Sequence, residues 1–311
     1  MRPARPPGPA GPAVASARQG TGLEWRPGPP GAGGATPAVA VAWPPVLVAE
    51  DLLEHGVVAA FSSRAGGLGR PPYDQLNLGL HVGDDVRTVL ANRRRVATVL
   101  GLAGLPWATV RQVHGASVAV AARDRFGQGP PEAKPALAEA DALVTAEGGV
   151  VLAVLAADCV PVLLADPAGR VVAAAHAGWK GLAAGVVEAA VAAFARAGGD
   201  PSAAVALVGP AVGPCCYEVG PEVLAAVGDR YPGAVAATRD GRPSLDLAAA
   251  AAEGLRRSGL ERVRGAGECT RDHPGRYFSH RRDGTTGRQA GLVALVPGRS
   301  GRPGARGGVP R

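Results

Sequence analysis

Apolar residues along this chain gather in short runs separated by turn-forming residues. Residues 57–62, 142–145, 160–165 and 205–208 are rich in Val, Leu and Ala, which is typical of buried strands. Residues 86–100 differ, because their apolar positions recur at spacings of three and four and so predict a helix. The same reasoning predicts strands at 109–113, 117–121, 150–155 and 171–175, and helices at 181–197 and 245–257, the last begun by Ser244.

Strands and helices alternate, but several neighbouring strands are joined by turns too short to hold a crossover helix. This mixture predicts an α/β fold, a single domain with mixed sheets and flanking helices, and it disfavours a doubly wound parallel sheet. Composition sets the expected boundaries: a disordered Pro/Gly-rich tail at 1–43, one catalytic domain at 44–297 and a disordered basic tail at 298–311.

The positive charge of the chain is concentrated in these tails. Residues 1–35 carry four Arg and one acid, and residues 298–311 carry four Arg and no acid, which accounts for the whole formal net charge of +7. The basic character is therefore a property of the tails and does not predict nucleic-acid binding. Removal of 1–35 and 298–311 is expected to leave the fold nearly intact.

Length and cysteine usage narrow the class of protein further. A chain of 311 residues that is 47% hydrophobic can bury a sizeable core. The sequence contains neither a secretory signal nor a long uncharged apolar span, and its four cysteines lack the spacing of a disulfide framework. These features predict a cytoplasmic protein without a membrane partner, and they carry no signal for an oligomeric state.

A predicted hairpin brings candidate chemistry together. The residues Asp166, Pro167, Ala168 and Gly169 carry the signature of a type I turn between two apolar runs. If the loop has two residues, Asp166 faces Gly169, and further along the hairpin Cys159 faces His176 with Cβ atoms about 5 Å apart. A bulge at Gly169 would shift this pairing by one position.

Cys159, His176 and His114 form a candidate metal-ligand set. Two imidazoles and one thiolate suit Zn²⁺, and three protein ligands leave the fourth tetrahedral position open, as in catalytic sites. Each residue taken alone is more simply a core cysteine or a hydrogen-bonded histidine. The predicted pairing of Cys159 with His176 and the adjacent Asp158 favour the metal site, whereas no local pattern ties His114 to the other two.

Further polar residues are candidates for substrate binding. Arg281 and Arg282 lie in a polar cluster, Arg64 lies in a Gly-rich loop, and each could bind a phosphate or ribose oxygen. Lys180 lies in a Gly-rich turn before a helix, where backbone N–H groups favour anions. Two remaining candidates are Asn77, in a polar loop, and Tyr217, which could stack on a planar base.

Together these motifs resemble the laccase-domain family, also called the multicopper polyphenol oxidase domain or YfiH-type family, over residues 57–296. That family includes proteins named purine nucleoside phosphorylase and peptidoglycan editing factor. The resemblance implies a single-domain α/β fold with Zn²⁺ bound by His114, Cys159 and His176. Lys180 stands where the family more often has Arg, so a cation is retained without the bidentate fork.

The resemblance also implies phosphorolysis of purine nucleosides, namely adenosine, inosine, guanosine and methylthioadenosine, and hydrolytic deamination of adenosine. The partners are then a purine nucleoside and phosphate. In this interpretation Asp158 is a catalytic proton shuttle in the deamination, while Arg64 and Arg281 are catalytic residues that hold the phosphate during phosphorolysis.

The oxidase activity in the family name is not expected. A blue-copper site together with a trinuclear cluster needs more ligands than 6 His and 1 Met can supply. Zinc is therefore the expected metal, not copper.

Three alternatives remain open from the sequence. Cys159 could be the nucleophile of a cysteine hydrolase, with His176 as its base. The chain could instead edit peptidoglycan precursors, or it could bind ligands without catalysis.

Overall fold

The computed structural model describes residues 22–26, 43–126 and 136–296. They form two six-stranded sheets, in the orders β1-β2-β3-β14-β7-β4 and β13-β10-β8-β9-β6-β5, and a two-stranded ribbon, β11-β12. We call the first of these sheet I and the second sheet II. The predicted α/β fold with mixed sheets and flanking helices is confirmed.

Sheet I is mostly antiparallel and has one parallel pair, β4 with β7, at an edge. Its strands are β1 (Glu24–Arg26), β2 (Val46–Val48), β3 (Val57–Ser62), β4 (Trp107–Ala108), β7 (Val151–Ala156) and β14 (Gln289–Leu295).

Sheet II has parallel pairs at both edges and antiparallel strands between them. Its strands are β5 (Val118–Val120), β6 (Ala142–Thr145), β8 (Val160–Ala165), β9 (Val172–Ala177), β10 (Val205–Val208) and β13 (Arg262–Gly265). The ribbon consists of β11 (Val235–Ala237) and β12 (Pro243–Leu245).

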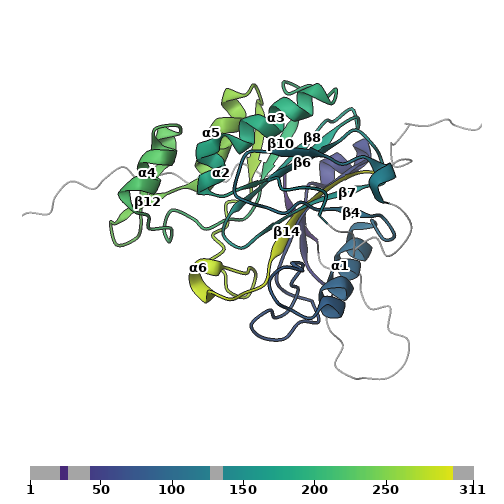
Figure 1. Ribbon diagram of the computed structural model, residues 1–311, viewed down its shortest axis with the longest axis horizontal. Helices are drawn as coiled ribbons and strands as arrows, with labels where there is room; N and C mark the ends of the chain where they lie inside the picture. The colour runs from purple at the N-terminus through teal and green to yellow at the C-terminus, as the bar shows by residue number, and fades with distance from the viewer. Residues whose placement is uncertain (1–21, 27–42, 127–135, 297–311) are drawn as a thin grey trace, which may run out of the picture.

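The two sheets pack face to face between helices (Figure 1). Phe61, Val154 and Val293 of sheet I meet Leu163 and Leu207 of sheet II in one buried cluster. Such burial on both faces explains why the strands are nearly continuous apolar runs. The α-helices are α1 (Val86–Leu100), α2 (Trp179–Ala184), α3 (Val186–Arg196), α4 (Pro221–Gly228), α5 (Leu247–Arg257) and α6 (His280–Asp283).

The helices divide between the outer faces of the sheets. Helix α1 covers sheet I, whereas α2, α3 and α5 cover sheet II on the opposite side of the molecule (Figure 1). Short 3-10 helices lie at Glu50–His55, Arg123–Phe126 and Pro232–Ala234. Among the residues that the structure describes, none of the helices has the length and apolar character to cross a membrane.

Several predicted elements differ in their bounds from the observed ones, and three of the differences have a clear local cause. The helix expected over 181–197 is two helices, because Gly185 adopts a left-handed φ of 84° between them. Helix α5 begins after Asp246, whose carboxylate accepts a hydrogen bond from the Ala249 N–H, and Ser244 lies in β12 instead.

The strand expected over 109–113 is also wrong, since β4 ends at Ala108 and only Arg111 makes a further bridge. The cause is the side chain of Gln112. It donates to the Leu155 carbonyl at 2.7 Å and accepts from the Leu155 N–H at 2.8 Å. This side chain replaces the backbone ladder and lets the chain turn away toward His114.

The expectation of a tail without structure over 1–43 is wrong for residues 24–26. They form β1, which pairs antiparallel with β2. Trp25 explains the attachment, because its indole N–H donates to Glu268 at 3.3 Å and the Arg276 guanidinium lies 5.0 Å from its ring centroid. The remaining residues of both predicted tails lie outside the described residues, apart from residues 22, 23 and 43.

Replacing Trp25 with Ala is expected to lower the free energy of unfolding by about 1–2 kcal/mol, through lost apolar burial and a lost hydrogen bond. Glu24→Ala is the matched control, because Glu24 is exposed on the same strand and should change stability little. Urea denaturation of both variants measures the difference. Equal stabilities would mean that β1 contributes nothing to the fold.

Candidate functional site

The three predicted ligands lie at one end of sheet II. Cys159 directly precedes β8, and His176 is near the end of the antiparallel strand β9. His114 lies in the loop before β5, which runs parallel to β6 at the same end of the sheet. Three segments far apart in the sequence therefore meet at a single edge.

The predicted pairing of Cys159 with His176 is wrong by two positions, since His176 faces Pro161. Asp166 causes the difference. Its N–H donates to the Val171 carbonyl at 3.0 Å, so the loop between the paired residues is longer than two residues. Because side chains alternate with a period of two, a shift by two keeps the cysteine and the histidine on the same side of the sheet.

The ligand atoms of His114, Cys159 and His176 all lie within 4.8 Å of one another. Cys159 Sγ is 3.9 Å from His114 Nε2, and the two imidazole rings meet edge to face with centroids 4.9 Å apart. We call this group the histidine–cysteine site. It offers two nitrogens and one sulfur around a common centre, which is the arrangement that a tetrahedral metal with one open position requires.

Asp141 organises the site from behind. One of its carboxylate oxygens lies 2.9 Å from His176 Nδ1, which leaves Nε2 of that ring for a metal. The same carboxylate accepts the backbone N–H groups of Val113, His114 and Gly115 at 3.1, 3.0 and 2.6 Å. Asp141 thus fixes both histidines, although the sequence reasoning did not identify it. The sequence signal that could have identified it is a single acidic residue directly before the apolar run 142–145.

The side chains of Cys159 and His176 shift each other's pKa in opposite directions. Burial raises the pKa of the Cys159 thiol. His176 and His114 lower that pKa by a larger amount, so the net shift is downward. Burial lowers the pKa of His176, while Cys159 and Asp141 raise it, and the net direction is up. The thiolate is therefore favoured, and thiolate is the form that binds metal or attacks an electrophile.

Two residues of this region have a strained backbone conformation. Within the part of the chain that the structure describes, only His114 and Asp158 among non-glycine residues have a positive φ, 61° and 93°. Such conformations cost about 1–3 kcal/mol and cluster at functional sites. Asp158 is held by Thr270 Oγ1 at 2.6 Å and by the Arg281 N–H at 2.6 Å. Asp158 therefore joins the Cys159 segment to two loops on other elements.

Two predicted substrate residues lie beside this network. The Arg281 guanidinium is 4.8 Å from the ring centroid of Tyr217 and donates to the Glu218 carbonyl at 3.0 Å. Burial raises the pKa of Tyr217 to about 12, and the negative charges of Cys159 and Asp158 act in the same direction. Tyr217 therefore lies within electrostatic range of the site.

The other predicted residues have partners of their own. Arg64 donates to the carbonyls of Asp74 and Pro274 and lies 4.7 Å from the Phe278 ring centroid. Lys180 is exposed on α2, with Nζ 5.6 Å from the Trp179 ring centroid.

Asn77 and Arg282 also make local bonds. The Asn77 side chain is buried and bonds Gly79, Asp84 and the Arg288 N–H. Arg282 donates to the carbonyls of Thr270, Arg271 and Tyr277. These bonds hold loops in place.

A further cation near the site is Arg288, which the sequence reasoning did not select. Burial lowers the pKa of its guanidinium, while the negative charges of Cys159 and Asp158 raise it. The charge of Arg288 also acts on His81. Burial and the charges of Arg288, Arg93 and His176 all lower the pKa of the His81 imidazole. Arg288 is thus a half-buried cation whose charge interacts with Cys159 and Asp158, and its guanidinium donates to the carbonyls of Thr286 and Gly287 at 2.9 Å.

Gly178 is the glycine that the site requires. A Cβ at this position would lie 2.9 Å from His114 Cδ2 and 3.0 Å from Cys159 Sγ. Gly178→Ala is therefore expected to separate the two ligands and to weaken metal binding about tenfold or more. Gly265→Ala is the control, because a Cβ there meets nothing within 4 Å. Competition against a chromophoric chelator measures both, and equal affinities would contradict this geometry.

A family model described as Multi-copper polyphenol oxidoreductase laccase matches residues 58–296. The chain belongs to this family, as its motifs predicted. A purine nucleoside phosphorylase of Streptomyces coelicolor is 48% identical over 241 residues, which is 78% of this chain and 96% of that protein. The purine nucleoside phosphorylase YfiH of Escherichia coli is 41% identical over 244 residues, 78% of this chain and 95% of that protein.

A solved structure shares the fold. The crystal structure of YlmD from Geobacillus stearothermophilus superposes with a TM-score of 0.74 at 34% identity, and the match covers 84% of this chain and 98% of that one.

Proposed function

We propose that this protein is a zinc-dependent purine nucleoside phosphorylase that accepts adenosine, inosine, guanosine and methylthioadenosine, and that it also deaminates adenosine. The observation that carries the proposal is the convergence of His114, Cys159 and His176 within 4.8 Å, in a chain whose relatives are named purine nucleoside phosphorylase.

The donor set fits zinc. Two imidazoles and a thiolate match its preference for nitrogen and sulfur, and Asp141 supplies the carboxylate that commonly supports a metal-bound histidine. When bound, zinc would supply a Lewis acid beside the substrate.

The remaining residues supply binding and charge in this proposal. Phosphorolysis brings a phosphate dianion to the ribose while the purine leaves, so the site needs fixed positive charge. Arg288 and Arg281 provide it, the first by its electrostatic proximity to Cys159 and the second beside Tyr217. Tyr217 offers an aromatic surface for the base. A proton-relay role for Asp158 and a catalytic role for Arg64 stay predictions. Binding of substrate by Asn77, Lys180 and Arg282 also stays a prediction.

Product identification tests the proposal. The purified protein is incubated with adenosine in the presence and absence of phosphate. Adenine and ribose-1-phosphate that form only with phosphate would establish phosphorolysis, and inosine would establish deamination. His114→Ala should abolish both, whereas His55→Ala, which removes an exposed histidine, should leave them unchanged. Absence of all three products in the wild type would overturn the proposal.

A cysteine hydrolase is the second candidate, and one observation favours it. Asp141, His176 and Cys159 follow one another as orienting acid, base and thiol, with the thiol pKa lowered. The two candidates differ in covalent chemistry. A hydrolase would form a covalent adduct at Cys159 during turnover, detectable by mass spectrometry, and would stay active after the metal is chelated. The zinc enzyme would form no adduct and would lose its activity after chelation.

A further inference from the structure

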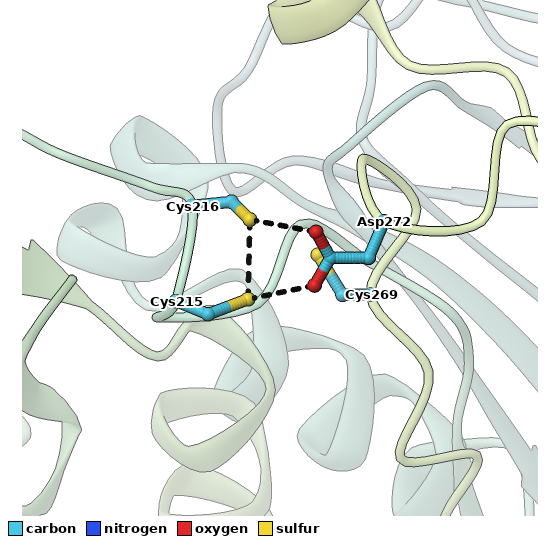
Figure 2. Close-up of side chains that lie close together, drawn as sticks. All are labelled: Cys215, Cys216, Cys269 and Asp272. Carbon is cyan, nitrogen blue, oxygen red and sulfur yellow. Dashed lines mark hydrogen bonds between the residues drawn. The ribbon is translucent and has the colours of Figure 1, made fainter. Parts of the chain in front are cut away.

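A second cluster of metal-binding side chains shares no residue with the histidine–cysteine site. The ligand atoms of Cys215, Cys216, Cys269 and Asp272 all lie within 4.8 Å of one another. Figure 2 shows the four side chains reaching from two segments toward one centre. All of the cysteines are free. We call this group the cysteine cluster.

The fold explains how these residues meet. Cys215 and Cys216 lie in the loop after β10, and Cys269 lies in the loop after β13. Strands β10 and β13 are parallel neighbours, so the loops that follow them leave the sheet at the same edge. An isolated bridge between Ala211 and Cys269 and the bond from the Thr270 N–H to the Ala211 carbonyl, 2.9 Å, hold the loops together.

The spacing of the ligand atoms is close to that of a metal site. The two sulfurs of Cys215 and Cys216 are 3.2 Å apart, and they lie 3.3 and 3.2 Å from the two carboxylate oxygens of Asp272. Tetrahedral zinc with Zn–S bonds of about 2.3 Å requires sulfur–sulfur separations of about 3.8 Å. Small side-chain rotations would therefore bring all four groups to bonding distance.

Burial raises the pKa of the Cys215 and Cys216 thiols, so a bound cation is needed to hold them as thiolates, and positive groups lie at the edge of the cluster. The Gly213 N–H donates to Cys269 Sγ at 3.1 Å, and the Arg239 guanidinium pairs with both oxygens of Asp272. Cys216 raises the pKa of the neighbouring Arg271 guanidinium. Three thiolates and a carboxylate around a divalent ion leave two negative charges, and these two arginines balance them. Such outer partners are typical of occupied metal sites.

We propose that Cys215, Cys216, Cys269 and Asp272 bind a second, structural zinc ion. Four protein ligands close the coordination sphere, so this ion would have no open position for substrate, unlike the ion proposed at the histidine–cysteine site. Three sulfurs favour zinc over magnesium or calcium, which prefer oxygen. A cavity of 260 Å³ lined by Cys215 and Cys269 adjoins the cluster.

The second ion would brace the first site. Thr270, which bonds Asp158, directly follows Cys269, and Tyr217, which lies against Arg281, directly follows Cys216. The Val212 N–H in the same loop donates to the Asp158 carbonyl at 2.9 Å. A metal that ties the two loops would therefore fix the strained backbone of Asp158 beside Cys159.

Metal analysis of the intact protein tests this inference. The wild type is expected to hold two zinc equivalents per chain, and Cys159→Ala is expected to retain one. After exchange with Co²⁺, the sulfur-to-cobalt charge-transfer band reports the number of thiolate ligands. Cys159→Ala should keep most of the band. Cys269→Ser and Asp272→Asn should each release the second equivalent of metal. In Cys269→Ser the band should also weaken, because one sulfur ligand is removed.

The outcomes separate this proposal from the proposed function, because none of them depends on turnover. If Cys269→Ser does not fold, the wild type and Cys159→Ala still decide the question. One equivalent in the wild type that disappears in Cys159→Ala would overturn the second site. A disulfide between Cys269 and a neighbouring cysteine, found as fewer than four thiols in denatured, chelator-treated protein, would overturn it too.

Discussion

Replacing Cys159 with Ala is expected to empty the histidine–cysteine site and to lower kcat/KM for adenosine phosphorolysis by about 1,000-fold. The substitution removes the only sulfur among the three ligand atoms gathered within 4.8 Å. Loss of a metal forfeits several kcal/mol of transition-state stabilisation, and each 1.4 kcal/mol corresponds to about a factor of ten. Zinc content and steady-state kinetics measure the two effects together.

Cys159→Asp is the control that separates ligand from nucleophile. A carboxylate can bind zinc but cannot form a thioester, so this variant should retain part of the metal and part of the activity. Metal bound without any turnover in Cys159→Asp would favour the cysteine hydrolase.

Replacing Asp141 with Asn is expected to weaken metal binding at the same site by about 10–100-fold. Its carboxylate orients His176 and accepts three consecutive N–H groups around His114. Asn keeps the shape but loses the charge, so both histidines lose their fixed positions.

Asp166→Asn is the matched control for Asp141. Asp166 is also buried and also accepts backbone and side-chain donors, but it lies at the turn of the β8–β9 hairpin. Both variants should lose some stability, and only Asp141→Asn should lose metal affinity, as measured by chelator competition. Equal affinities in the two variants would show that Asp141 has no part in the site.

The sequence predicted best the elements whose burial is continuous. Residues 57–62, 142–145, 160–165 and 205–208 are strands with the expected bounds, because every residue in each of them is buried. The bounds of α1 also agree, because Asp85 caps its N-terminus and Gly101 its C-terminus. Errors occurred where a single backbone torsion or side chain decided the outcome, as at Gly185 and Gln112.

The candidate site was predictable in part. Cys159 and His176 could be paired through the hairpin, and the error of two positions preserved their face of the sheet. His114 could be added only through the family resemblance, since Asp141 positions it across a large sequence separation. The cysteine cluster was missed for the same reason: its two halves meet only because β10 and β13 are neighbours.

Metal removal tests the central claim most directly, namely that a metal at the histidine–cysteine site supports purine nucleoside phosphorolysis. The protein is stripped with a chelator, and phosphate-dependent release of adenine from adenosine is followed before stripping, after stripping and after addition of zinc. The account predicts that stripping abolishes adenine release and that zinc restores it in the wild type but not in His114→Ala. Full phosphorolysis by the metal-free protein would contradict it.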